Sequence, residues 1–306
     1  MDKCIIWGLG KDYEKIINQL KFEIFKGNIE ITALVSKEDS SWCQRRDGYL
    51  LLPKDKLIDI DFDYLIITSN RFFCEIKKEI LLLGIPENKI INGQVLNLPL
   101  FDWNRYISLI KNPITILSNN CWGGLIYSKL FLPFSSPLIN LYIPSNSFLK
   151  FIQNPIYYLE KPLQMIREGD IRKNQCPIGK IGNGDDNINI IFTHSFSFKE
   201  AEELWNRRVK RINKDRLFVK YSVSGQDKKQ DEYLQIFDKI LLPKICFYSG
   251  ETDIKNVVYL KRFESYVHQG LFVKTLKFEE YTLYTELLFK DIDVLKMLNG
   301  EDDFLR

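Results

Sequence analysis

One stretch near the middle of the chain, residues 113–127, constrains the fold most. It reads PITILSNNCWGGLIY, in which an apolar run rich in β-branched residues ends in three polar residues before a glycine pair and a second apolar segment. β-branched residues favour strands, whereas asparagine and glycine favour turns. The pattern predicts a strand–turn–helix unit, the place where α/β proteins put phosphate or substrate sites.

The turn of this unit is a candidate ligand site. Asn119 and Asn120 could cap the helix or hydrogen-bond a ligand, because their amides both donate and accept. Gly123 and Gly124 would let an anion approach the backbone N–H groups of the first helical turn. The alternative is a tight turn stabilised by asparagine, with Trp122 packed beneath it. The sequence leaves both interpretations open.

The N-terminal third of the chain alternates short apolar runs with segments of helical period. Strands are predicted at 4–7, 29–35, 62–68 and 89–91, and helices at 13–20 and 73–81. Strands that alternate with helices form parallel sheets with right-handed crossovers. We therefore predict a Rossmann-like N-terminal domain with a parallel sheet, residues 1–105.

A Gly-x-Gly turn follows the first predicted strand and favours a dinucleotide site. Gly8 and Gly10 are the predicted cofactor-binding residues, with NAD or S-adenosylmethionine as candidate cofactors. Two parts of the full fingerprint are missing. Tyr13 stands where a third glycine or alanine is expected, and Ser-Lys at 36–37 follows the second strand, so that the first acid comes only at Glu38. The cofactor therefore stays unknown, and the domain could bind another nucleotide or serve for packing alone.

Beyond residue 105 the alternation predicts a second α/β domain, residues 106–306. Strands are predicted at 114–117, 136–143, 188–192, 217–221 and 244–248, and helices at 148–152, 155–159, 198–212, 281–289 and 292–298. A glycine-rich loop is predicted at 176–186. We expect a three-layer α/β domain with a parallel or mixed sheet, which makes the whole chain an α/β protein of two domains.

Polar side chains follow several of these strands, and ligands of open parallel sheets bind beyond the carboxyl ends of the strands. His194, one of two histidines, is the predicted catalytic acid or base, since imidazoles titrate near neutral pH. Alternatively, a backbone carbonyl satisfies it at the start of a loop. We expect Asn119, Asn120 and His194 to line one cleft, with Asp185 or Asp186 at its rim.

Further side chains could contribute to the site. Asp185 and Asp186 could hold a divalent cation beside a diphosphate, or could simply form part of a turn. Arg207 could clamp a phosphate, or lie on the solvated face of its helix. Cys121 stands beside the glycine pair, where a nucleophile could stand, but the sequence identifies no base that would activate it.

Composition argues against several classes of function. The 43 basic and 40 acidic residues leave a net charge of +3, without the basic excess of a dedicated nucleic-acid binder. The six cysteines form no Cys-x-x-Cys pair, so no metal site is expected. No apolar run approaches the ~18 residues of a membrane helix, and the start lacks the form of a signal peptide. We expect a cytoplasmic protein without a membrane span, of unknown oligomeric state.

Several motifs of the second domain resemble those of an uncharacterised bacterial family, whose members are often labelled exopolysaccharide biosynthesis proteins. The motifs are SNNCWGG at 118–124, SSP at 135–137, PIG at 177–179, FTH at 192–194 and AEELWNRRVKRIN at 201–213. The resemblance covers roughly the last two-thirds of the chain. It assigns no catalytic residue, because none is established for the family. The N-terminal part is similar, more loosely, to Rossmann-like modules of other surface-polysaccharide enzymes.

The resemblance implies a sugar or nucleotide-sugar context and leads to our main hypothesis. The protein would be a transferase-like enzyme of surface-glycan assembly that binds a nucleotide-activated donor between its domains. The turn at 118–124 would hold phosphate, and His194 would serve as the base. The competing hypothesis is a non-catalytic binding or assembly module with a degenerate Rossmann domain, which the incomplete glycine fingerprint favours. An oxidoreductase is a third possibility.

Overall fold

The computed structural model describes residues 1–35, 45–170, 175–223, 228–248, 250–259 and 292–305. The fold is α/β, with a parallel-rich sheet in the N-terminal part and a parallel sheet in the C-terminal part. The chain divides into two compact units, Met1–Lys111 with Ile292–Arg306, and Asn112–Asp291. The division expected from the sequence left the end of the chain in the second domain, whereas its contacts lie with the first unit.

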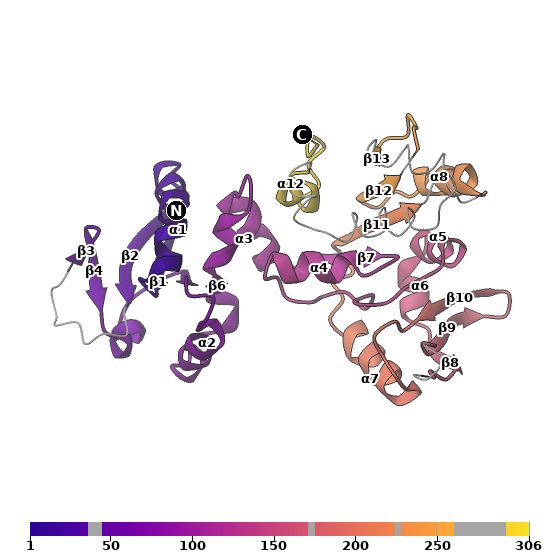
Figure 1. Ribbon diagram of the computed structural model, residues 1–306, viewed down its shortest axis with the longest axis horizontal. Coiled ribbons are helices and arrows are strands. Elements are labelled where there is room, and N and C mark those ends of the chain that lie inside the picture. Colours follow the sequence, from indigo (N-terminus) through magenta and orange to yellow (C-terminus); the bar gives the residue numbers. More distant parts are fainter. Residues whose placement is uncertain (36–44, 171–174, 224–227, 249, 260–291, 306) are drawn as a thin grey trace. The chain divides into compact units, whose positions relative to one another are not determined.

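The first unit is built on a six-stranded sheet in the order β3-β4-β2-β1-β5-β6 (Figure 1). Its strands are β1 Asp2–Trp7, β2 Ile29–Val35, β3 Arg45–Arg46, β4 Tyr49–Leu52, β5 Tyr64–Ile67 and β6 Ile90–Asn92. All neighbouring strands pair in parallel except β3, which is antiparallel to β4. The four strands predicted here are present. β3 and β4 were not predicted, because their few residues include no sustained apolar alternation.

Most helices of the first unit bury apolar residues, whereas the short η2 (Glu87–Lys89) buries none. They are α1 Lys11–Phe25, η1 Lys54–Asp59, α2 Phe73–Leu82, η2 Glu87–Lys89, η3 Gly93–Asn97, α3 Trp103–Lys111 and α12 Val294–Leu298. In α1 the buried residues Tyr13, Ile16 and Leu20 recur every three or four positions, the spacing of one helix face. Against the sheet, the apolar side chains of β1 and β5 pack with Ile76 and Ile80 of α2.

The end of the chain is fastened to α3. Arg105 forms two hydrogen bonds with the carboxylate of Glu301, one of them 2.8 Å long, and Asn299 Nδ2 donates to the Arg105 carbonyl at 3.1 Å. Leu295 and Met297 of α12 are buried. The segment 292–305 therefore belongs structurally to the first unit.

The second unit contains a parallel sheet in the order β13-β12-β11-β7. Its strands are β7 Thr115–Ser118, β11 Leu217–Val223, β12 Lys244–Tyr248 and β13 Val257–Tyr259, and its helices are α4 Trp122–Lys129, α5 Ser145–Gln153, α6 Pro155–Leu159, α7 Phe198–Val209 and α8 Gln230–Asp238. Alternate residues of β11 (Val219, Tyr221 and Val223) face a core cluster shared with α5 and α8. The residues between them, including Lys220, therefore face the other side of the sheet.

A separate antiparallel sheet, β10-β9-β8, corrects two predictions. It consists of β8 Gln164–Arg167, β9 Ile178–Asn183 and β10 Asp186–Ile191. The run 188–192 does not continue the parallel sheet but pairs antiparallel with β9. The predicted glycine-rich loop at 176–186 is mostly β9 and a two-residue hairpin turn at Gly184 and Asp185, where Gly184 has φ +53°.

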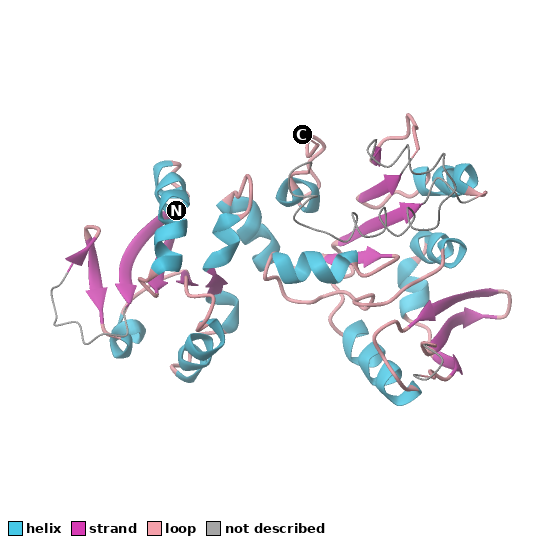
Figure 2. Ribbon diagram, viewed as in Figure 1, coloured by secondary structure: helices cyan, strands magenta, loops and turns pink. Residues whose placement is uncertain are grey.

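The remaining elements follow the predictions with one further exception. The predicted strand at 136–143 consists of turns with an isolated bridge between Tyr142 and Ile191, since Pro137 and the left-handed Asn140 (φ +54°) interrupt it. The predicted helix at 281–289 and Glu38 lie outside the described residues. Figure 2 shows helices and strands in both units. Of the helices within the described ranges, none combines the length and the apolar character that a membrane crossing requires.

Candidate functional sites

Asn119, at the carboxyl end of β7, holds two strands together. Its Oδ1 accepts a hydrogen bond from the Ser222 N–H (3.1 Å), and its Nδ2 donates to the Ser222 carbonyl (3.2 Å). The side chain is buried and prolongs the β7–β11 ladder by one amide. Because the backbone of Ser222 uses both ends of this amide, the structure gives Asn119 a structural role and assigns it no contact that a ligand would replace.

Asn120 accepts a hydrogen bond from the first N–H group of the following helix and contacts a buried lysine. Its Oδ1 accepts hydrogen bonds from Lys220 Nζ (2.9 Å), the Trp122 N–H (3.2 Å) and Ser118 Oγ (3.2 Å). Its Nδ2 is buried, and no hydrogen-bond partner for it is found among the described residues. A buried amide donor without an acceptor is costly, which makes Asn120 a candidate for contact with a ligand oxygen.

Lys220, which was not predicted as a site residue from the sequence, is fully buried within β11. Its Nζ lies 2.9 Å from Asn120 Oδ1, 5.8 Å from the ring centre of Trp122 and 5.6 Å from that of Phe247. A buried ammonium is costly unless polar groups or aromatic faces compensate it. The signal was a lysine in the middle of the otherwise apolar run LFVKYSV.

The glycine pair of α4 provides close packing. A Cβ on Gly123 would lie 3.2 Å from Ile116 Cγ2, and one on Gly124 would lie 3.1 Å from Asn140 Oδ1. Both glycines are buried in the first turn of the helix. The sequence alone suggested that these glycines open the backbone to a ligand. The structure adds a second reason for glycine at both positions, because α4 packs closely against β7 and against residues 139–140.

His194 lies beside Cys121. The distance between His194 Nε2 and Cys121 Sγ is 3.7 Å. Cys121 is the N-cap residue of α4 and is partly exposed, whereas His194 is exposed on the loop after β10. The structure thus brings the predicted base next to a thiol, which the sequence alone could not show because 73 residues separate them.

Residues 140–143 bring these two side chains together. The Ile143 N–H donates to the Asn119 carbonyl (3.0 Å), and Tyr142 exchanges two hydrogen bonds with Ile191 at the end of β10. Thr193 Oγ1 donates to the Asn140 carbonyl (2.9 Å). The end of β10 is thereby fixed beside the end of β7, although the two strands belong to different sheets.

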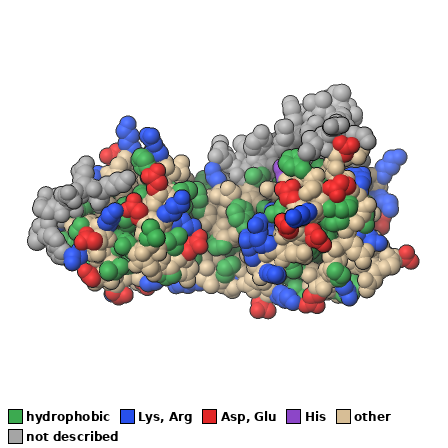
Figure 3. All heavy atoms as spheres, turned by 90° about the horizontal axis from the view of Figure 1, so that it is seen from below, with side chains coloured by type: hydrophobic (Ala, Val, Ile, Leu, Met, Phe, Trp, Pro, Cys, Tyr) green, Lys and Arg blue, Asp and Glu red, His purple; other side chains and the backbone are tan. Residues whose placement is uncertain are grey.

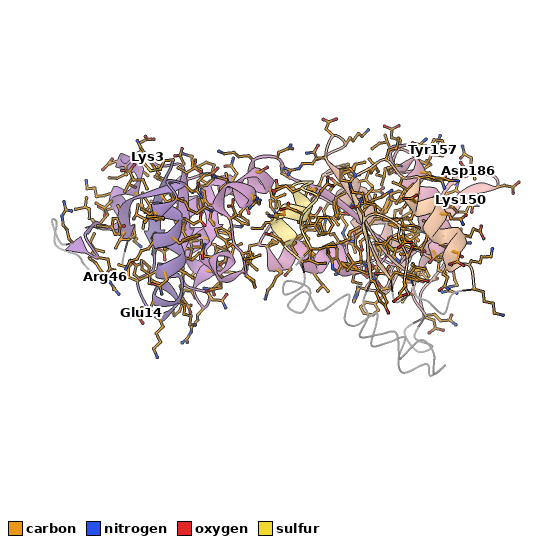
Figure 4. The ribbon with its side chains drawn as sticks, turned by 90° about the horizontal axis from the view of Figure 1, so that it is seen from above. Lys3, Glu14, Arg46, Lys150, Tyr157 and Asp186 are labelled. Atoms are coloured by element: carbon orange, nitrogen blue, oxygen red, sulfur yellow. The ribbon has the colours of Figure 1, made fainter. Side chains whose placement is uncertain are left out.

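Asp185 and Asp186 lie away from this pair, at the other end of β10. A six-residue strand spans roughly 17 Å, so neither carboxylate is at the rim of a cleft beside His194. Asp186 Oδ1 accepts a hydrogen bond from Tyr158 (2.6 Å) and lines a separate hollow of about 540 Å³ with Lys150 and Tyr157. Figure 4 shows Lys150, Tyr157 and Asp186 together.

Arg207 is exposed on α7, as the solvated-face interpretation has it. Its neighbour Arg208 instead turns inward and donates to the Ile139 carbonyl at 2.6 Å, and burial lowers the pKa of this guanidinium. On the face shown in Figure 3, basic and acidic side chains lie intermingled. Within the described ranges no group of three or more His, Cys, Asp and Glu side chains gathers to hold a metal ion.

A cavity of about 630 Å³ lies in the first unit, at the carboxyl ends of β1 and β5. Gly8 and Gly10, the predicted cofactor-binding residues, both line it. So do four cationic side chains and one carboxylate, namely Lys11, Lys15, Arg46, Arg71 and Asp12. Gly10 is the N-cap of α1, so the N–H groups of its first turn lie at the cavity.

The glycine turn has a geometry that requires glycine at its start. Gly8 has φ +102°, and a Cβ there would lie 2.9 Å from Thr68 Oγ1. Tyr13 occupies the third position of the fingerprint. Its side chain is buried, and its hydroxyl donates a hydrogen bond to Asp47 (2.9 Å). The missing third glycine is thus replaced by a packed side chain.

Comparisons with known proteins divide the chain after residue 91, ahead of the boundary between the two units after Lys111. Residues 1–91 match a family model described as C2185-like, N-terminal, and residues 92–299 match the model described as domain of unknown function (DUF1919). The chain is 32% identical over 158 residues to an uncharacterized protein of Haemophilus influenzae, an alignment that covers 51% of this chain and 72% of that protein. Since the second model spans more than half of the sequence, the chain belongs to the family described as domain of unknown function (DUF1919).

Proposed function

We propose that the protein is a transferase-like enzyme of bacterial surface-polysaccharide assembly that takes a nucleotide-activated donor. The Rossmann-like character of the first unit and the exopolysaccharide context of the family are parts of this proposal. The observation that carries it is the cavity at the end of β1, where a glycine turn, a helix N-terminus and a surplus of cationic side chains meet.

The sheet order supports a ligand at this place. β1 is central, with β2 on one side and β5 on the other, so the chain order reverses at β1. In doubly wound sheets such a switch point opens a crevice outside the carboxyl ends of the strands. The cavity lined by Gly8, Gly10 and Thr68 occupies that position.

The charges at the cavity support a phosphate ligand. Lys15 is paired with Asp12 at 2.9 Å, whereas Lys11 and Arg71 form no ion pair within the described part of the chain. A diphosphate would accept charge-assisted hydrogen bonds from both. Phe72, a residue 40% exposed at the same cavity, has the Arg71 guanidinium 5.2 Å from its ring centre, so a base that stacked here would lie beside this cation.

The test measures nucleotide binding by calorimetry, with UDP, ADP, GDP and CMP as probes. We expect at least one of them to bind the wild-type protein. Lys11→Ala and Arg71→Ala should each weaken binding roughly tenfold, the effect of losing one charge-assisted hydrogen bond. Added salt should weaken binding further.

The matched control is Lys21→Ala, which removes the same charge from an exposed position later in α1. It should leave the affinity within about twofold, since a screened charge beyond one Debye length contributes little. The proposal is wrong if none of the probes binds at millimolar concentration, or if Lys21→Ala weakens binding as much as Arg71→Ala does.

The alternative function is a non-catalytic binding or assembly module. Two observations favour it. The Asn119 side chain forms its hydrogen bonds with the backbone of Ser222, and Gly123 packs closely against β7, so both residues have structural roles. A module of this kind would bind a nucleotide without consuming it. Incubation of the protein with UDP-sugars and analysis of released UDP separates the two functions, because release requires chemistry.

A further inference from the structure

The second unit contains a thiol and an imidazole in contact, and this observation does not depend on nucleotide binding by the first unit. Cys121 Sγ and His194 Nε2 are 3.7 Å apart, and both residues reach the surface. A nucleophile within reach of a base is the signature of covalent catalysis. We infer that Cys121 is a nucleophile that accepts an acyl group from an activated ester or thioester, with His194 as its general base.

The position of Cys121 favours its thiolate. It is the N-cap of α4, an eight-residue helix, and the aligned peptide dipoles place partial positive charge at that end. The buried amino group of Lys220 donates a hydrogen bond to the side chain of Asn120, the residue directly before Cys121. Thiolates form most readily at helix N-termini and next to cationic groups.

The same turn holds donors for a developing oxyanion. The Trp122 N–H is used by Asn120 Oδ1, but the next N–H groups of the first turn, from Gly123 and Gly124, have no acceptor within the helix. Asn120 is only 6% exposed, and its Nδ2 has no hydrogen-bond partner in the described ranges. Donors of these kinds stabilise tetrahedral intermediates of acyl transfer.

The proposed reaction balances without a redox partner. His194 takes the Cys121 proton, and Sγ attacks the acyl carbon to form the C–S bond. The bond to the leaving alcohol or thiol breaks, and that group takes the proton from His194. A hydroxyl group, from an acceptor or from water, then attacks the thioester carbon and gives its proton to His194. The C–S bond breaks, and His194 returns the proton to Cys121 Sγ.

The other described cysteines provide internal controls. Cys4 and Cys246 are fully buried, and burial raises the pKa of each thiol. Cys74 is exposed on α2 of the first unit, and Cys176 is partly buried with its Sγ 3.8 Å from the Thr193 carbonyl. No hydrogen bond to an imidazole is found for either of the latter two within the described ranges, so they serve as reference thiols, and the His194→Ala variant isolates the contribution of His194.

The first experiment follows alkylation by iodoacetamide at neutral pH with peptide mass spectrometry. We expect Cys121 to react at least tenfold faster than the exposed Cys74. His194→Ala should slow Cys121 at least fivefold and leave Cys74 unchanged. Equal rates for Cys121 and Cys74, or no effect of His194→Ala on Cys121, would overturn the inference.

The second experiment mixes the protein with p-nitrophenyl acetate. The wild type should release a burst of p-nitrophenolate equal to the enzyme concentration and gain the mass of one acetyl group on Cys121. Cys121→Ser should lose the burst while keeping the wild-type circular dichroism spectrum, whereas Cys176→Ser should retain it. A burst that survives in Cys121→Ser contradicts the assignment. Because neither experiment contains a nucleotide, failure of this inference can be distinguished from failure of the nucleotide titration.

Discussion

A methyl group added to Gly123 would lie 3.2 Å from Ile116 Cγ2 and 3.4 Å from Ser118 Cβ, both on the adjoining strand. The first distance is shorter than an ordinary van der Waals contact, so Ile116 or the helix has to give by a few tenths of an ångström. We expect Gly123→Ala to lower the free energy of unfolding by about 1–2 kcal/mol, since overpacking outweighs the gain in helix propensity. Urea unfolding followed by tryptophan fluorescence measures this change.

The control for this prediction introduces alanine in the same helix. Ser128→Ala changes an exposed residue of α4 and should leave the free energy of unfolding within about 0.5 kcal/mol. If Gly123→Ala proves as stable as Ser128→Ala, α4 has room to shift away from β7, and the packing reason for Gly123 is wrong.

The residue scale also shows what a motif can and cannot predict. The stretch PITILSNNCWGGLIY predicted a strand, a turn and a helix, and all three are present. It could not predict that the Asn119 amide forms hydrogen bonds with the backbone, whereas the Asn120 amide has a donor without an acceptor in the described ranges. That depends on Ser222 and Lys220, which lie about a hundred residues further along the chain. The roles of Asn119 and Asn120 therefore depend on contacts between residues far apart in the sequence, which a local sequence pattern does not predict.

At the scale of one element, α3 begins at a charged cap. Asp102 Oδ1 accepts a hydrogen bond from the Arg105 N–H (3.0 Å), and its Oδ2 is 2.9 Å from Lys26 Nζ. Although burial raises the pKa of Asp102, these hydrogen bonds outweigh it and hold that pKa below its ordinary value. The folded state is therefore stabilised by the carboxylate form.

This shift predicts a pH dependence. Because the folded pKa of Asp102 is depressed, its contribution is complete above the unfolded value of about 3.9 and is lost as pH falls through the folded value. Asp102→Asn should cost about 0.5–1 kcal/mol at pH 7 and should unfold with a shallower dependence on acid pH. Urea titrations of both proteins between neutral and acid pH measure it, and parallel curves would contradict the role of Asp102.

The elements were predicted where sequence period and length agree. The apolar runs of β1, β2, β5 and β7 and the amphipathic faces of α1 and α7 gave correct types. The partner of β10 was not predicted, because a six-residue apolar strand looks alike in a parallel and an antiparallel sheet. The glycine turn at 182–184 was the available hairpin signal, and it was interpreted as a loop.

At the scale of the whole molecule, the first unit takes in the end of the chain through the buried residues of α12. Leu295 is 3% exposed, so Leu295→Ala should destabilise the first unit by about 2–4 kcal/mol. Leu305→Ala, at a residue that is 55% exposed, is the matched control and should change little.

Hydrogen exchange identifies the unit that responds. For Leu295→Ala we expect lower protection of the amides of β1 and β5, which belong to the same unit as α12, with β11 and β12 unchanged. Loss of protection in β11 instead would show that α12 stabilises the second unit, contrary to the division of the chain described above.

The attachment of α12 to α3 has a consequence for synthesis on the ribosome. Domains usually fold in the order in which they emerge, N-terminal first. Here the contact between Arg105 and Glu301 spans 196 positions, and the whole of the second unit is translated in between. During the synthesis of residues 112–291, α3 has already emerged but lacks its contact with α12 and Glu301. We therefore expect chaperones that bind exposed apolar helix faces to stay bound to the first unit for longer than to the second unit.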